Sequence, residues 1–350
     1  MKASYKQHIL QFKRPSGTSR GVLLEKETWF IILEEGGRYG IGECGLLRGL
    51  SVDDTPEYEA RLNKVCDTLS RGDLDLEMEL QNYPSIRFGL EQAKLSLAAE
   101  DSMELFPSDF LKHADPISIN GLIWMGEPDF MLEQLEEKLE EGFQCIKMKI
   151  GAIAFEKELE ILESIRNRFD KESIELRVDA NGAFSTDEAL DKLHTLAQYH
   201  IHSIEQPIRQ GQWEAMRHLC VNTPIPIALD EELIGVYALD DKAELLETIK
   251  PQYIILKPSL LGGFQASKEW ITLAEQQGID WWVTSALESN IGLNAIAQWT
   301  YTLKNPMPQG LGTGGLYTNN FDSPLEIVNG HLRYNRDKEW SQNLITELCT

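Results

Sequence analysis

From about residue 116, short apolar runs alternate with amphipathic segments. The apolar runs have the length of strands, and the segments between them carry the spacing of surface helices. Strands are predicted at 117–120, 145–149, 174–179, 201–205, 225–230, 253–257 and 279–285, with a short eighth near 309–311. Helices are predicted at 130–140, 155–169, 186–199, 213–219, 243–249, 265–277 and 292–303. Because strands that alternate with helices pair in parallel through right-handed crossovers, this predicts an α/β fold. Seven or eight such units favour a closed barrel over a long doubly wound sheet.

The pattern before residue 116 is different. Runs rich in β-branched and aromatic residues predict three strands at 5–12, 22–33 and 39–43, with Gly36-Gly37 as a turn. Helical patterns follow at 56–69 and 85–99. Strands first and helices next indicate a separate α+β unit over residues 1–115, with the barrel at 116–320. A hairpin around Asn329-Gly330 predicts that the segment 321–350 returns to the first unit.

Composition excludes several classes of protein. The chain has 350 residues, of which 42% are hydrophobic and 25% charged, and a formal net charge of −23. So acidic a surface repels nucleic acid and anionic membranes, but a local cluster of cations still admits a small anionic substrate. The cysteines at 44, 66, 145, 220 and 349 form no CxxC pair, and no apolar run is long enough to span a bilayer. We therefore expect a reduced, cytoplasmic protein; no pattern in the sequence specifies its oligomeric state.

Charged residues recur at the predicted strand ends. After Lys147-Met148-Lys149 they are Asp179, Glu205, Asp230 and Lys257, and the steps from 149 onwards are 30, 26, 25 and 27 residues. One strand, loop and helix need about that much chain. In a parallel barrel these side chains would ring the mouth, where such folds carry their chemistry. Each motif taken alone can be explained by structure without any function: as a surface lysine, as an Asx turn at Asp179-Ala-Asn-Gly, or as a helix cap at Asp230-Glu-Glu. Their recurrence at equivalent positions favours a shared site.

The residue types indicate a metal-assisted proton transfer. Three carboxylates form an oxygen-only site that suits Mg²⁺, with Mn²⁺ as a possible substitute, and without an HxxxH or HxH pair zinc is disfavoured. Such an ion would bind a substrate carboxylate and stabilise the negative charge that forms when the adjacent carbon loses a proton. A lysine base must be neutral, although its ordinary pKa is about 10.4. A second ammonium and a metal ion would lower that pKa, so one lysine of the pair Lys147 and Lys149 is expected to stay charged and bind the carboxylate while the other acts as the base. Lys257, from across the barrel, would be an acid, a second base or a fixed positive charge.

The set K-M-K, D-A-N-G, I-E-Q-P, D-E-E and L-K-P-S resembles the enolase superfamily, and within it the muconate-lactonising subgroup. The resemblance covers nearly the whole chain and implies a (β/α)7β TIM-type barrel with an α+β capping domain built from both termini. It implies Mg²⁺ ligands at Asp179, Glu205 and Asp230, the proton-abstracting lysine at Lys149, and Lys257 on the opposite face of the substrate.

Two segments are most similar to the o-succinylbenzoate synthases of that subgroup. Ser285 to Gly292 matches their S-x-x-E-S-x-x-G segment, and Arg14 to Gly21 is similar to their mobile lid loop. This implies syn dehydration of 2-succinyl-6-hydroxy-2,4-cyclohexadiene-1-carboxylate, in menaquinone biosynthesis, through a metal-stabilised enediolate. By position, Arg20, Arg177, Asn181 and Ser285 are expected to contact the substrate.

Other reactions stay open. An N-acylamino acid racemase would also use two opposed lysines. A dipeptide epimerase resembles its relatives in an Asp-x-Asp on the eighth strand, where this chain has Gly310-Leu-Gly-Thr-Gly-Gly315. A lysine Schiff-base aldolase, which needs no metal, and a non-catalytic barrel are alternatives of a different class.

Overall fold

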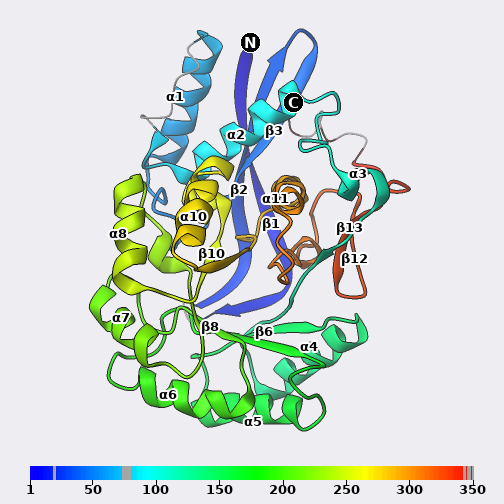
Figure 1. The fold of residues 1–350 in the computed structure, drawn as a ribbon. Helices are drawn as coiled ribbons and strands as arrows, with labels where there is room; N and C mark the ends of the chain where they lie inside the picture. Colours follow the sequence, from blue (N-terminus) through cyan, green and yellow to red (C-terminus); the bar gives the residue numbers. More distant parts are fainter. Residues whose placement is uncertain (19–20, 73–79, 342–343, 345–347, 349–350) are drawn as a thin grey trace.

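The computed structural model describes residues 1–18, 21–72, 80–341, 344 and 348. Figure 1 shows helices α1 and α2 at one end of the molecule, and the long strands β1 and β2 running from that end down to the strands of the barrel. The predicted fold class is confirmed: the chain forms a parallel α/β barrel with an α+β capping domain. Within the described residues, no helix is both long and apolar enough to cross a membrane.

The capping domain is built on an antiparallel meander in the described part of the chain. Its strands are β1 (Lys2–Thr18), β2 (Gly21–Glu35) and β3 (Arg38–Cys44), with α1 (Tyr58–Ser70) and α2 (Pro84–Ala98) packed beside them. Alternate residues of a strand face opposite sides of the sheet. Trp29, Ile31 and Leu33 therefore pack against α1 and α2, while Phe30 and Ile32 pack with Phe321, Leu344 and Leu348. Gly42 lets β3 approach α2, since a Cβ there would lie 1.8 Å from the Gly89 carbonyl oxygen.

Part of the predicted lid loop is strand in this structure, and its role as a lid remains a prediction. Arg14–Thr18 belongs to β1, and Ser16 and Gly17 pair with Leu23 and Val22 of β2 after an irregularity that follows Gln11. Gly17 also bridges to Met125 of the barrel, which anchors the hairpin at this point. Residues 19 and 20, including the predicted substrate contact Arg20, lie outside the described part.

The barrel holds seven parallel strands among the described residues, in the order β11-β10-β9-β8-β7-β6-β5. They are β5 (Gly121–Ile123), β6 (Cys145–Lys149), β7 (Glu175–Asp179), β8 (Ser203–Glu205), β9 (Ile227–Leu229), β10 (Tyr253–Leu256) and β11 (Asp280–Val283). The eighth position is held by two isolated parallel bridges, within the range where the sequence predicted a short eighth strand. Gln309 bridges to Ile119 and Gly310 to Thr284, so this segment joins the two edges and closes the ring.

Helices cover the outside of the barrel (Figure 1). They are α4 (Pro128–Glu140), α5 (Phe155–Arg166), α6 (Ala189–Leu196), α7 (Trp213–Asn222), α8 (Leu239–Ile249), α10 (Phe264–Gln276) and α11 (Asn290–Leu303), with short helices α3 (Asp109–His113) and α9 (Pro258–Leu261). Turns of 3₁₀ helix lie at Ala197–Tyr199, Glu231–Leu233 and Gly314–Leu316. The strands contribute apolar residues to one continuous core beneath these helices.

The barrel strand predicted at 117–120 is wrong: residues 117–118 form a strand of a small antiparallel sheet, and the barrel strand β5 begins only at Gly121. β4 (Ile117–Ser118) pairs antiparallel with β13 (His331–Tyr334), and the chain then continues into β5 of the barrel. β12 (Leu325–Val328) and β13 form the predicted Asn329-Gly330 hairpin, with φ values of 50° and 69° at the turn. The division into 1–115, 116–320 and 321–350 remains a prediction.

Candidate active site

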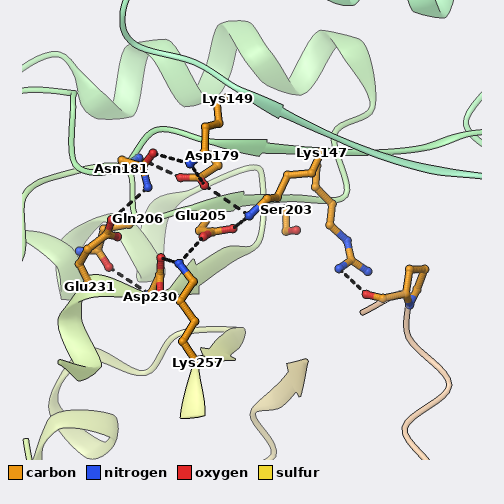
Figure 2. Close-up of polar contacts among 12 residues, drawn as sticks. Lys147, Lys149, Asp179, Asn181, Ser203, Glu205, Gln206, Asp230, Glu231 and Lys257 are labelled. Carbon is orange, nitrogen blue, oxygen red and sulfur yellow. Dashed lines mark hydrogen bonds and ion pairs between the residues drawn. The ribbon is translucent and has the colours of Figure 1, made fainter. Parts of the chain in front are cut away.

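The charged residues predicted at the strand ends lie side by side in the barrel mouth. Lys149 is paired in register with Asp179 on the next strand, and Asp179 with Glu205 on the one after. Asp230 follows β9 directly, and Lys257 follows β10. Because the strands are parallel, all of these side chains come from the same end of the barrel. Figure 2 shows them converging on one small region.

Two lysines alternate with the three carboxylates. Lys147 Nζ lies 2.8 Å from Glu205 Oε2 and 3.4 Å from Asp179 Oδ2. Lys257 Nζ forms an ion pair with Asp230 Oδ2 and lies 3.7 Å from Glu205 Oε1 (Figure 2). All of these carboxylates are buried, so each depends on the neighbouring ammonium groups for its charge compensation.

Lys149 is held separately, at the edge of this cluster. Its Nζ donates to Asp179 Oδ2 at 2.8 Å and to Asn181 Oδ1 at 2.7 Å. Asn181 has a left-handed backbone, and its N–H bonds Asp179 Oδ1 at 3.0 Å, which is the predicted Asx-type turn. Its amide nitrogen then donates to Glu231 Oε1 at 3.0 Å. The turn therefore positions an acceptor for the predicted base.

The glutamine of the I-E-Q-P motif organises the neighbouring D-E-E segment. Gln206 Oε1 accepts from the N–H groups of Asp230 and Glu232, at 3.2 and 3.3 Å. Its amide nitrogen donates to Glu232 Oε2 at 2.9 Å. Asp230 itself makes no side-chain cap to the turn that follows, so the helix-cap reading does not account for its carboxylate. Gln206 thus fixes the backbone that presents Asp230 to the site.

Burial and ion pairing act against each other on the pKa values here. Burial would raise the pKa of Asp179, but Lys149, Lys147 and Lys257 together hold that pKa well below its usual range. The pKa of Asp230 is instead raised, because burial and the acidic neighbours Glu231 and Glu205 outweigh Lys257. Burial lowers the pKa of Lys147 and Lys257, yet the surrounding carboxylates raise both above their ordinary value. Lys147 and Lys257 are therefore held as cations in this arrangement.

The donor set fits a hard divalent cation by its chemistry. The three carboxylates stand on neighbouring strands, and the buried Glu205 Oε1 has no hydrogen-bond partner among the described residues. As the side chains stand, no three acidic, histidine or cysteine residues of the described part are gathered around one point. Lys147 and Lys257 lie between the acids instead. The three carboxylates supply the oxygen donors that a hard divalent cation takes.

A cavity of about 280 Å³ opens over this cluster. Its polar end is formed by the side chains at the strand ends, namely Lys147, Lys149, Asp179, Asn181 and Lys257. The rest of its wall comes from two parts of the chain, the capping domain (Gly21, Val22, Leu23, Leu47, Arg48, Gly49, Leu50) and the barrel (Asn120, Leu122, Trp124, Thr284, Ser285, Ala286, Leu287, Gly310, Gly312, Thr313). The capping domain thus completes the cavity that the strand ends begin.

The predicted substrate contacts differ in position. Asn181 and Ser285 line the cavity, while Arg177 does not. Arg177 Nε lies 2.7 Å from Glu175 Oε1, Nη1 lies 2.9 Å from the Pro308 carbonyl oxygen, and the guanidinium lies over the Trp282 ring. Arg177 shares a face of β7 with Asp179 but lies one pleat deeper. Its role as a substrate contact remains a prediction.

Sequence reasoning missed Trp124 and the segment Leu47–Leu50, both in the cavity wall. The alternation of residues in the sequence could have identified Trp124. Asn120, Leu122 and Trp124 alternate along one strand direction and all line the cavity, as Lys147 and Lys149 do on β6. Leu47–Leu50 had no such signal, because it belongs to the other domain.

Comparisons with known proteins agree with this geometry. A family model described as enolase C-terminal domain-like matches residues 131–338. An o-succinylbenzoate synthase from Desulfotalea psychrophila is 48% identical, over 95% of this chain and 98% of that protein. The crystal structure of MenC from the same organism superimposes with a TM-score of 0.85 at 44% identity, covering 95% of this chain and 99% of that one. An L-Ala-D/L-Glu epimerase from Bacillus subtilis shares the fold, with a TM-score of 0.81 at 19% identity, over 97% and 98% of the two chains. The chain therefore belongs to the enolase C-terminal domain-like family.

Proposed function

We propose that this protein is an o-succinylbenzoate synthase, a hydro-lyase that removes water from 2-succinyl-6-hydroxy-2,4-cyclohexadiene-1-carboxylate in menaquinone biosynthesis. The observation that carries the proposal is the placement of Lys149 and Lys257 at one cavity, beside three buried carboxylates. The choice among the family's reactions is supported by the 48% identity to the synthase from Desulfotalea psychrophila over 95% of this chain.

Asp179, Glu205 and Asp230 would hold Mg²⁺, or Mn²⁺ in its place. When bound, the ion supplies positive charge at the substrate carboxylate and so offsets the negative charge that develops when the adjacent carbon loses its proton. Lys147 stands between Asp179 and Glu205, and its charge would bind the same carboxylate. The substrate is accordingly a small anionic carboxylate.

Lys149 performs the proton transfers in this mechanism. In its neutral form Nζ takes the proton from the ring carbon next to the carboxylate, while Asn181 Oδ1 holds the amine in place. The ammonium that results gives the same proton to the leaving hydroxyl, the ring C–O bond breaks, and water departs. A single base on one face of the ring accounts for the syn course of the elimination. Lys257, held as a cation by Asp230, supplies positive charge from across the cavity.

An absorbance assay for o-succinylbenzoate tests the proposal on the purified protein. Product should form with Mg²⁺ and cease when EDTA removes the metal. A protein that forms no o-succinylbenzoate under these conditions contradicts it. Activity that survives EDTA, combined with trapping of the substrate by borohydride, would instead indicate a Schiff-base aldolase.

A second candidate is racemisation of an N-acylated amino acid, which the two lysines at one cavity also favour. Racemisation needs a base on each face of the α-carbon, and Lys149 and Lys257 come from strands on different sides of the barrel. Incubation of an N-succinyl amino acid in deuterated water separates the two reactions. A racemase exchanges the α-proton for deuterium, whereas a protein that is only a synthase leaves it in place.

A further inference from the structure

The segment Ser285 to Gly292 lies where the barrel meets the capping domain. Ser285 Oγ donates to Glu288 Oε2 at 2.6 Å and accepts from Thr313 Oγ1 at 2.8 Å and from the Leu287 N–H at 3.1 Å. A hydroxyl group has one donor and two acceptor positions, and all three are used here. Ser285 therefore shapes the cavity wall, but its hydroxyl has no capacity left for a substrate.

The other oxygen of Glu288 reaches a different part of the site. Ser259 Oγ donates to Glu288 Oε1 at 2.5 Å. Ser259 lies in α9, two residues after Lys257, which is the residue directly before that helix. One fully buried carboxylate thus ties the wall at Ser285 to the segment that carries Lys257.

The capping domain contributes a cation and a second acid at this place. Lys26 of β2 is 3% exposed, and its Nζ has no hydrogen-bond partner among the described residues. Burial lowers the pKa of Lys26, and the charges of Glu43 and Glu288 oppose that effect. Burial likewise raises the pKa of Glu288, against the effects of Lys26, Ser259 and Ser285. We call Lys26, Glu43 and Glu288 the interdomain junction.

Glu43 binds the start of α11. Its carboxylate accepts from the Ser289 N–H at 2.9 Å, from Ser289 Oγ at 2.5 Å and from the Gly292 N–H at 2.8 Å. A Cβ at Gly292 would lie 2.8 Å from both Glu43 Oε2 and Glu288 Cβ, so only glycine leaves room for the two acids. Each of the four residues in the S-x-x-E-S-x-x-G pattern therefore belongs to or contacts the interdomain junction.

We propose that Glu288 is a positioning residue that sets the geometry of the substrate cavity at the place where the barrel meets the capping domain. It acts on the cavity wall through Ser285 and on Lys257 through Ser259. The inference rests on the proposed function, since it concerns how that site is held.

A double-mutant cycle on kcat and KM tests the inference. Ser285→Ala should raise KM about fivefold, because the cavity wall loses the three hydrogen bonds of this hydroxyl, including the one to Glu288, with kcat nearly unchanged. Ser259→Ala should instead lower kcat, because Ser259 connects Glu288 to the segment that carries Lys257. Glu288→Gln should show both effects, since an amide keeps a single acceptor oxygen for two serine donors. Adding Ser285→Ala to Glu288→Gln should then change KM by less than twofold.

Glu91→Gln is the matched control. Glu91 of α2 also joins the two domains, accepting from the N–H groups of Phe264 and Gln265 at 2.6 and 3.2 Å, but it does not line the cavity. This variant should lower the melting temperature and leave kcat and KM within about twofold of the wild type.

Some outcomes would overturn the inference. One is a Glu288→Gln variant with a lower melting temperature but unchanged kcat and KM; another is additivity of the KM effects of Glu288→Gln and Ser285→Ala. If Glu288→Gln does not fold, the two serine variants test the inference. Ser285→Ala must then raise KM and Ser259→Ala must lower kcat, and any other result contradicts it. A wild type without synthase activity contradicts the proposed function instead, and the same cycle is then measured on deuterium exchange into an N-succinyl amino acid.

Discussion

At the scale of single residues, Lys149 stands apart from the other lysines of the site. Lys147 and Lys257 lie between carboxylates that raise their pKa values, whereas Lys149 contacts one carboxylate and the neutral amide of Asn181. Lys149→Ala should reduce turnover by on the order of 10³-fold, which is within the range for loss of a general base. Steady-state assays check this, with Lys157→Ala, an exposed lysine on α5, as the control.

The Lys149→Ala protein should keep the wild-type circular dichroism spectrum. Residual dehydration within tenfold of the wild type, in a folded protein, would remove Lys149 from the role of base. Trp124, whose ring lies 6.0 Å from Lys149 Nζ, offers a fluorescence signal for ligand binding in the same variant.

At the scale of elements, Glu158 stabilises the turn between β6 and α5. It is buried and accepts from the Gly151 N–H at 2.6 Å, just beyond Lys149. Burial raises its pKa to about 7, above an ordinary value of 4.5. Because the folded state holds this proton more tightly than the unfolded state, the contribution of Glu158 to stability falls as pH rises from 4.5 to 7.

Glu158→Gln removes this titration and keeps an acceptor oxygen for Gly151. The variant should therefore gain stability relative to the wild type between pH 5 and pH 8, by at most about 3 kcal/mol. Denaturant unfolding at pH 5, 6 and 8 measures the difference. A difference that is constant with pH would show that Glu158 has no raised pKa in the folded protein. Asp53, also buried and with a pKa raised to about 6, is present in both proteins and so cancels.

At the scale of the whole molecule, a bound metal ion would offset the negative charge of the carboxylates buried at the site. Three buried carboxylates lie beside the cavity, paired with Lys147, Lys149 and Lys257, in a chain of net charge −23. Mg²⁺ should raise the melting temperature, with about 2.7 kcal/mol of added stability at 100 times its dissociation constant. Asp230→Asn should lose most of this increase, in a thermal scan that needs no substrate. An exposed acid on α6, changed as Asp191→Asn, serves as the control for weak binding to the acidic surface. Equal stabilisation of both variants would count against a metal site at Asp230.

The barrel and the ring of charges at its mouth could be predicted from the amino-acid sequence alone. Both follow from local periodicity, because a parallel strand that ends in a charged residue must present it at the same edge as its neighbours. The same periodicity does not show how deep a side chain lies in the barrel, or which residue of the other domain it faces. Arg177 and Asp179 share a face, yet only packing against Trp282 and Pro308 shows that Arg177 lies below the cavity. The wall at Leu47–Leu50 and the junction of Lys26 with Glu43 and Glu288 join residues far apart in the chain. Such contacts depend on how the two domains dock, and because no short-range sequence pattern records that docking, they are seen only in the folded chain.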